Sequence, residues 1–167
     1  AQEPLPDRAA ARLLVLDRAS QTIRHRHVRD LPDILSPNDL MVVNDSRVVP
    51  ARLYGRRAET EGRWEGLFLS EVVGVDGRRL LRLLSKTRGR LRVGERIVVV
   101  GEQGQDLAVL ELVAPDSGGT WLVDPCSEEA TVQFLSRVGR VPLPGYIREG
   151  IAQSDDVERY QTVFATQ

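Results

Sequence analysis

The chain is organised around one stretch, Leu40-Met41-Val42-Val43-Asn44-Asp45-Ser46-Arg47-Val48-Val49-Pro50-Ala51-Arg52-Leu53. It begins with a short apolar run followed by four polar residues, a pattern that predicts a buried strand leading into a loop. Asn44 and Ser46 can donate and accept hydrogen bonds, and Asp45 can only accept them. Arg47 adds a rigid fork of donors. This mixture suits a polar small molecule, although Asn-Asp-Ser clusters also form simple turns.

Before this stretch, the pattern predicts a hairpin and a short helix. Residues 12–17 are expected to form an apolar strand and residues 22–28 a polar, alternating strand, so the two are expected to pair. Asp30 is then placed to cap a helix that has a proline in its first turn.

After the stretch, short strands follow one another, and most are separated by turns that contain glycine. The expected strands are residues 51–57, 63–73, 78–84, 95–100, 107–113 and 120–123. This regular spacing predicts a small antiparallel β-barrel. A barrel also leaves no exposed strand edge.

The period changes after residue 126. Ser127 followed by two acids predicts a helix over 127–138, which Gly139 ends. Prolines predict an extended segment over 141–147. A further short helix is expected from Ser154 to about residue 160, and a strand is expected to begin at 161–165. Because the chain stops there and begins with Ala1, we expect it to be a piece of a longer protein.

Composition is that of an ordinary globular protein, with 41% hydrophobic and 28% charged residues. There is no apolar run of membrane-spanning length and no secretory signal pattern, so the cytoplasm is the expected location. Cys126 is the single cysteine, which excludes a cysteine-rich zinc site. His25 and His27 share a strand face but have no obvious third metal ligand, so an exposed polar face is the simpler interpretation.

Charge is distributed unevenly although the net charge is −1. Residues 78–96 contain eight basic side chains and one acid, whereas residues 101–136 contain no Lys or Arg. If the two stretches lie on different faces, the domain is strongly dipolar. Within the basic run, alternation predicts a strand with a basic stripe that could follow a nucleic-acid backbone, formed by Lys86, Arg88, Arg90 and Arg92. A solvated barrel face explains the same pattern equally well.

Four stretches together resemble one family, the S-adenosylmethionine:tRNA ribosyltransferase-isomerases of queuosine biosynthesis. They are residues 12–17, 44–53, 139–147 and 159–165. Departures from the usual family pattern are mild: Ser46 replaces Thr, Gly145 replaces a second Pro, Phe164 replaces Tyr, and the usual Pro before Ser85 is absent. The larger departure is length, because family members continue well beyond this point.

The resemblance implies a fold that is mainly β (α+β), with a small antiparallel β-barrel inserted into part of an α/β domain. The first part of that domain would be residues 1–59, the barrel residues 60–138, and the return to the α/β domain residues 139–167. The implied reaction transfers the ribosyl group of S-adenosylmethionine to 7-aminomethyl-7-deazaguanine at the tRNA wobble position, isomerises it to epoxyqueuosine, and releases adenine and methionine. No metal and no cofactor beyond S-adenosylmethionine, which is a substrate, are implied, and we expect a monomer.

On this interpretation the opening stretch carries the reaction site. Asp45 is the candidate general base. The candidate substrate-binding residues are Asn44, Ser46, Arg47, Arg52, Tyr160 and Gln161. The basic stripe would contact tRNA. The alternatives are a non-catalytic RNA-binding β-barrel module, which leaves residues 44–47 and 159–162 unexplained, and an inactive fragment of the enzyme.

Overall fold

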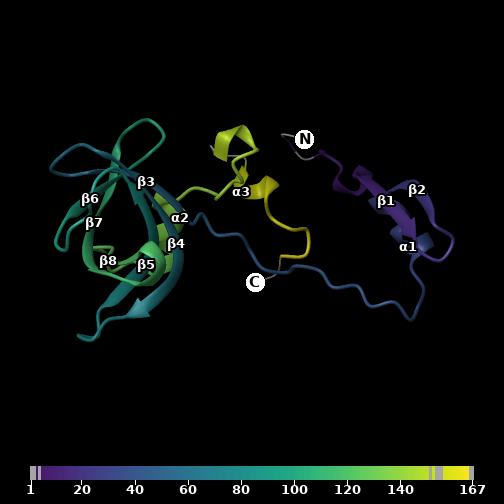
Figure 1. Ribbon diagram of the computed structural model, residues 1–167, viewed down its shortest axis with the longest axis horizontal. Helices are drawn as coiled ribbons and strands as arrows, with labels where there is room; N and C mark the ends of the chain where they lie inside the picture. Colours follow the sequence, from purple (N-terminus) through teal and green to yellow (C-terminus); the bar gives the residue numbers. More distant parts are fainter. Residues whose placement is uncertain (1–2, 4, 151, 153–155, 166–167) are drawn as a thin grey trace.

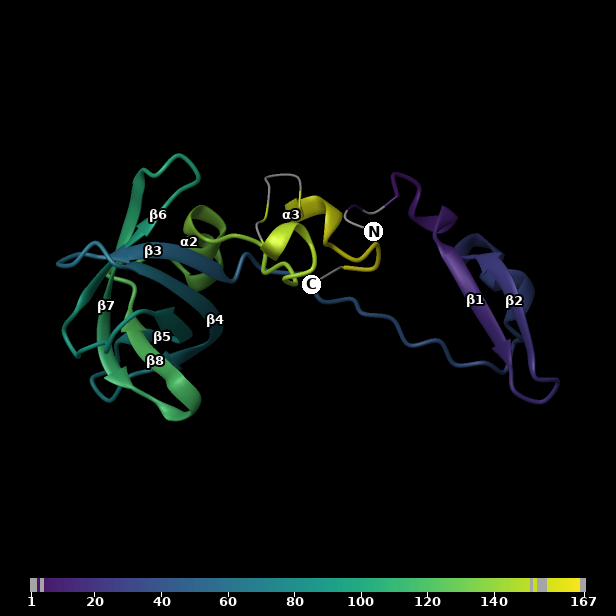
Figure 2. The same cartoon turned by 45° about the horizontal axis from the view of Figure 1, so that its top comes forward.

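The computed structural model describes residues 3, 5–150, 152 and 156–165. A small hairpin lies at one end of the long axis and a β-barrel at the other, and the chain around α3 (Asp156–Arg159) lies between them (Figures 1 and 2). A long extended segment, blue in Figure 1, runs from the hairpin to the barrel.

The hairpin pairs β1 (Arg12–Asp17) with β2 (Thr22–His27) in antiparallel register, as the sequence predicts. Hydrogen bonds from Ser20 and from the backbone of Ala19 to the Asp17 carboxylate shape the turn and lower the pKa of Asp17. The 3₁₀ turn η1 (Arg8–Ala10) precedes the hairpin. The 3₁₀ turn η2 (Val28–Asp30) and the short helix α1 (Leu31–Ile34) follow it. Asp30 is the N-cap residue of α1, as predicted, but its carboxylate accepts from His27 N.

The predicted buried strand at 40–43 is wrong. Residues 39–51 form no helix or strand, and Leu40 and Val42 are 90% and 85% exposed. A strand needs a neighbouring edge to satisfy its backbone groups. The barrel is closed and offers no free edge, and the hairpin lies apart from this segment (Figure 1). No described part of the chain therefore covers these apolar side chains.

Six strands form the closed antiparallel barrel, in the order β3-β4-β5-β8-β7-β6. They are β3 (Arg52–Arg57), β4 (Arg63–Val73), β5 (Arg79–Thr87), β6 (Arg96–Val100), β7 (Asp106–Pro115) and β8 (Thr120–Asp124). The mainly β fold and the barrel predicted from the sequence are thus confirmed. The barrel includes β3, as the strand pattern predicted, so it begins at residue 52 and not at residue 60, the bound that the family resemblance implied. The assignment of both flanks to one α/β domain stays a prediction.

Alternating side chains of the strands fill the barrel. Nine are at most 1% exposed: Leu53, Trp64, Leu81, Leu83, Ile97, Val99, Leu110, Leu112 and Val123. Trp64 is the largest, and a Cβ atom on Gly66 would lie 2.3 Å from its ring. Gly66 therefore leaves space for the ring inside the barrel. Burial of each such side chain contributes about 1.5–3 kcal/mol.

The helix α2 (Thr131–Val138) covers the barrel with its apolar face, as Phe134, Leu135 and Val138 join the barrel core. It begins at Thr131 and not at the expected Ser127, because the Ser127 hydroxyl accepts from Glu129 N and holds a turn there. Gly139 ends the helix in an extended conformation. A Cβ atom on Gly139 would lie 1.8 Å from the Pro50 carbonyl oxygen, so this crossing of two chain segments requires glycine.

A second, smaller core lies outside the barrel and consists of Val141, Leu143, Ile147 and Ala152, with Val48 and Tyr160 packed against it. Residues 141–144 form no helix or strand, and Leu143 N donates to the Val141 carbonyl at 3.0 Å; residues 145–147 turn, where the sequence predicted an extended segment. The strand expected at 161–165 is wrong. Thr162 bends this segment by accepting bonds from Phe164 N and Ala165 N. The predicted cap at Ser154 lies outside the described residues.

Candidate functional site

A cavity of about 380 Å³ lies beside the second core. Its lining combines residues from both ends of the chain: Glu3, Arg8, Asn44, Val48, Ile147, Asp156, Arg159, Tyr160, Gln161 and Thr162. Three of the predicted substrate-binding residues, Asn44, Tyr160 and Gln161, are therefore brought together although 116 positions separate the first from the second.

Gln161 joins the two sides of this cavity. Its side-chain oxygen accepts from Val48 N, and its side-chain nitrogen donates to the Val48 carbonyl, both at 2.8 Å. The Gln161 amide thus makes the two hydrogen bonds with Val48 that the backbone of a neighbouring strand would otherwise make. It therefore fixes the position of the segment that carries residues 44–47.

Arg8 is a residue that the sequence analysis missed. Its guanidinium donates to the carbonyls of Glu158 at 3.0 Å, Arg159 at 2.9 Å and Gln161. These carbonyls lie at the C-terminal end of α3, where that of Glu158 also accepts from Gln161 N at 3.3 Å. The contact spans more than 150 positions, so no local sequence pattern could have indicated it.

Tyr160 is partly buried beside the cavity. Burial raises the pKa of its phenol, and the neighbouring Tyr146 and Asp156 add to this increase. The hydroxyl therefore remains protonated at neutral pH and can donate a hydrogen bond. Asp156 is 2% exposed and is paired with Arg148.

The other predicted site residues lie outside the lining of this cavity. Asn44 itself accepts from Ser46 N at 2.9 Å, which is the turn geometry of the simpler interpretation. Asp45, Ser46 and Arg47 are exposed on the same segment. Arg52 lies on β3, where its backbone pairs with Arg140 and its side chain reaches Glu65 at 3.4 Å.

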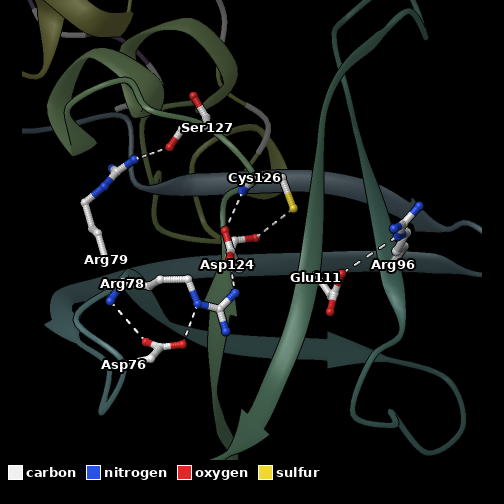
Figure 3. A network of polar contacts seen from close by, with 8 residues as sticks. All are labelled: Asp76, Arg78, Arg79, Arg96, Glu111, Asp124, Cys126 and Ser127. Carbon is white, nitrogen blue, oxygen red and sulfur yellow. Dashed lines mark hydrogen bonds and ion pairs between the residues drawn. The ribbon is translucent and has the colours of Figure 1, made fainter.

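The basic run and the acidic stretch are not separated onto different faces. Three arginines of the basic run pair with acids of residues 101–136: Arg78 with Asp124, Arg82 with Asp116 and Arg96 with Glu111. Figure 3 shows the pair of Arg96 and Glu111 beside Asp124, which Arg78 contacts. By contrast, none of the four predicted RNA-contacting side chains has an acidic partner within the described residues, and all are exposed. Those four are Lys86, Arg88, Arg90 and Arg92.

These four residues do not form the predicted strand stripe. Lys86 lies on β5, but the strand ends at Thr87, and the three arginines lie on the loop of residues 88–95. The left-handed Gly89 begins this loop, and such a conformation does not fit a regular strand.

Arg57 and Glu95, both missed by the sequence analysis, hold that loop. Arg57 donates to the carbonyls of Arg88 and Arg90, at 3.3 Å each, and its Nε pairs with Glu95. The other oxygen of Glu95 accepts from Arg92 N at 3.1 Å. The Arg57 and Glu95 side chains are 14% and 7% exposed. Arg57 and Glu95 therefore hold the backbone of this loop, while the side chains of its arginines are exposed to solvent.

Cys126 lies beside Asp124, and its thiol faces the Asp124 carbonyl at 3.8 Å (Figure 3). Cys126 is exposed, but partial desolvation raises the pKa of its thiol, and the Asp124 charge adds to the increase. Because the thiolate is the nucleophile, this environment makes Cys126 a poor one at neutral pH.

We therefore expect iodoacetamide to alkylate Cys126 more slowly in the folded chain than in guanidinium at pH 7.5. A raised pKa lowers the thiolate fraction at each pH below it, so the difference should narrow as the pH rises beyond 9. Mass spectrometry of samples taken over time measures both rates. Equal rates at pH 7.5 would contradict this account of the thiol.

His25 and His27 are exposed on β2. Within residues 3, 5–150, 152 and 156–165, no three His, Cys, Asp or Glu side chains are grouped so that they could hold a metal ion. Nor does any helix in the described part of the chain have the length and apolar character needed to cross a membrane.

Comparison with known proteins decides the family. A sequence model described as "Queuosine biosynthesis protein" matches residues 1–167. The chain belongs to this queuosine biosynthesis family. Within the family, it is 42% identical over 165 residues to a protein of Symbiobacterium thermophilum named S-adenosylmethionine:tRNA ribosyltransferase-isomerase. Proteins of the same name from Pelobacter propionicus and Staphylococcus saprophyticus are 41% and 37% identical.

These matches cover 99% of the chain but only 45–46% of each relative. The chain therefore spans about half the length of the curated relatives it matches. A solved structure, the S-adenosylmethionine tRNA ribosyltransferase of Thermotoga maritima, is 29% identical, with a TM-score of 0.37 over 83% of this chain and 44% of that one. The match to the family model over residues 1–167 confirms the resemblance found in the sequence motifs.

Proposed function

We propose that this chain contributes to a tRNA-modifying enzyme of queuosine biosynthesis. The enzyme transfers the ribosyl group of S-adenosylmethionine to 7-aminomethyl-7-deazaguanine at the wobble position, isomerises it to epoxyqueuosine, and releases adenine and methionine. The observation that carries this proposal is 36–42% identity, over nearly the whole chain, to proteins named for this activity. S-adenosylmethionine is a substrate on this proposal, and no other cofactor or metal takes part.

The cavity beside the second core supports a substrate site on this segment. Asn44, Tyr160 and Gln161 line it, and all three have polar atoms that can bind ribose hydroxyls or an amino acid group. Asp45, Ser46 and Arg47 follow directly on the same segment. Asp45 is the proposed base that removes a proton from the ribosyl carbon next to the sulfonium. Arg47 and Arg52 are proposed to bind the methionine carboxylate or a tRNA phosphate, since guanidinium groups pair with both in bidentate fashion.

The exposed basic loop of the barrel supports a tRNA-binding face. The proposed contacts to phosphates are Lys86, Arg88, Arg90 and Arg92. Among the described residues, no acid pairs with these four side chains, whereas acids do pair with Arg78, Arg82 and Arg96 of the same run. A cytoplasmic location and a monomeric state belong to the same proposal. So does the division into a barrel and an α/β domain formed by its two flanks.

Replacing both Arg88 and Arg90 with alanine should weaken tRNA binding and reduce its dependence on salt. Each lost phosphate contact lowers the slope of log K against log salt by about one, so the double variant should lose about two. Nitrocellulose-filter binding at several salt concentrations measures the slope.

Arg24 and Arg26 offer a matched control, because they are also two exposed arginines spaced by two positions, on the distant hairpin. The Arg24→Ala/Arg26→Ala variant should keep the wild-type slope. Equal reductions in both double variants would indicate nonspecific attraction and would count against the basic loop as the tRNA face.

The reaction itself is tested by incubating the full-length protein with ribosyl-labelled S-adenosylmethionine and precursor tRNA. Label in the tRNA together with free adenine and methionine is the expected result. Tight tRNA binding without label transfer would instead favour the non-catalytic RNA-binding module.

A further inference from the structure

A second cavity, of about 660 Å³, opens at one end of the barrel between the basic loop and β8. This mouth pocket is defined by polar and apolar residues, chiefly Ser85, Thr87, Arg90, Leu91, Arg92 and Trp121. Its volume lies in the range of about 300–1,000 Å³ that is typical of ligand sites, and the mouths of barrels are common places for them.

The pocket arises because the inward face of the barrel changes character along β5. Leu81 and Leu83 point inward and are fully buried. By the period of two, the next inward positions are Ser85 and Thr87. On β8, Trp121 pairs with Leu83, and the fully buried Val123 lies two positions further along. Trp121 is therefore the inward side chain of β8 nearest this end of the barrel. It packs against the barrel core and also lines the mouth pocket.

The Ser85 hydroxyl is the second notable feature of the pocket. Its oxygen is enclosed and has no hydrogen-bond partner within the part of the chain that the structure describes. Thr87, the next inward residue, instead donates to the Arg63 carbonyl at 2.6 Å. Ser85 and Thr87 therefore make the inner wall of the mouth pocket polar where the core of the barrel ends.

The third feature is the rigid and basic rim of the pocket. Arg90 and Arg92 lie on the loop whose backbone is fixed by Arg57 and Glu95. Leu91, between them, packs against the barrel core. The anchoring of Leu91 in the core leaves the two guanidinium groups at the edge of the pocket, exposed and without acidic partners among the described residues.

We propose that the mouth pocket binds one unpaired nucleotide of the bound RNA. Its base would stack on the Trp121 ring, and its phosphate would pair with Arg90 and Arg92. Stacking on aromatic side chains beside a positive groove is the general mode by which proteins hold single-stranded nucleic acid. The inference rests on the proposed tRNA binding and specifies that part of the contact is to unpaired RNA.

The test compares a labelled single-stranded adenylate hexamer with a blunt RNA duplex of equal length, using fluorescence anisotropy on the wild-type chain and its variants. Trp121→Leu should weaken hexamer binding by roughly five- to 150-fold, the range expected for one lost stacking contact. Trp121→Phe, which keeps a ring, should weaken it less. Both variants should change duplex binding by less than about twofold. Equal losses for hexamer and duplex, or unchanged hexamer binding, would overturn the proposal.

Intrinsic fluorescence gives a readout that does not depend on any variant. Trp64 and Trp121 are the two tryptophans of the chain, and Trp64 is 1% exposed inside the barrel. The hexamer should therefore quench the emission of Trp121, and Arg90→Gln should require a higher hexamer concentration for the same quenching. Saturation without quenching would overturn the proposal even if Trp121→Leu fails to fold.

Two further measurements distinguish a free nucleotide from RNA as the ligand, and the nucleotide site from the proposed reaction. Adenosine 5′-monophosphate should compete with the hexamer only weakly, and competition as strong as that of the hexamer would show a free-nucleotide site instead. Quenching by the hexamer in a full-length protein that does not modify tRNA would refute the proposed reaction and leave the nucleotide site in place. Modification of tRNA with no quenching would refute the nucleotide site alone.

Discussion

Replacing Trp64 with alanine should lower the free energy of unfolding by about 3–5 kcal/mol, the usual cost of removing a large aromatic side chain from a core. The ring is 1% exposed and fills the barrel interior, where Gly66 leaves space for it. Its Nε1 has no hydrogen-bond partner in the described chain, so the loss comes from packing and not from a broken hydrogen bond. Urea unfolding followed by far-UV circular dichroism measures the change.

Leu69→Ala serves as the control, since Leu69 lies on the same strand, β4, but is 48% exposed. Its effect should stay within about 0.5 kcal/mol. If Trp64→Ala cost no more than Leu69→Ala, the barrel would not be packed around this ring.

Replacing Asp45 with asparagine in the full-length protein should lower turnover by a factor on the order of a hundred or more, because a general base typically contributes this much. The substitution keeps the shape of the side chain and removes its charge. Asp45 is exposed on the segment that Gln161 fixes through Val48, so the substitution should leave the fold intact. Single-turnover kinetics with labelled S-adenosylmethionine measures the chemical step.

Asp33→Asn provides a matched control, because Asp33 is also an exposed aspartate and lies on α1, away from the cavity. It should leave turnover unchanged. A rise in KM with turnover preserved in Asp45→Asn would indicate a role in substrate binding alone. Wild-type values for both constants would mean that Asp45 only shapes a turn.

The features that the sequence determined are local ones. The alternation of side chains and the glycine-containing turns predicted the barrel strands to within a few residues, because strand period and turn chemistry depend on neighbouring residues. The hairpin of residues 12–27 was predictable for the same reason. The family motifs were equally readable, because each of them is a contiguous run of residues, and they were sufficient to indicate the family.

Only the tertiary structure decided which charges are neutralised and which segments are covered. Arg57 and Glu95 meet across 38 positions, and Arg8 reaches Gln161 across 153, distances over which no sequence period carries information. The prediction of a buried strand at residues 40–43 was wrong because a local sequence pattern cannot show whether a free sheet edge is available to pair with the segment. In the basic run, folding paired Arg78, Arg82 and Arg96 with acids and left the loop arginines exposed, since pairing depends on which strands become neighbours in the closed barrel.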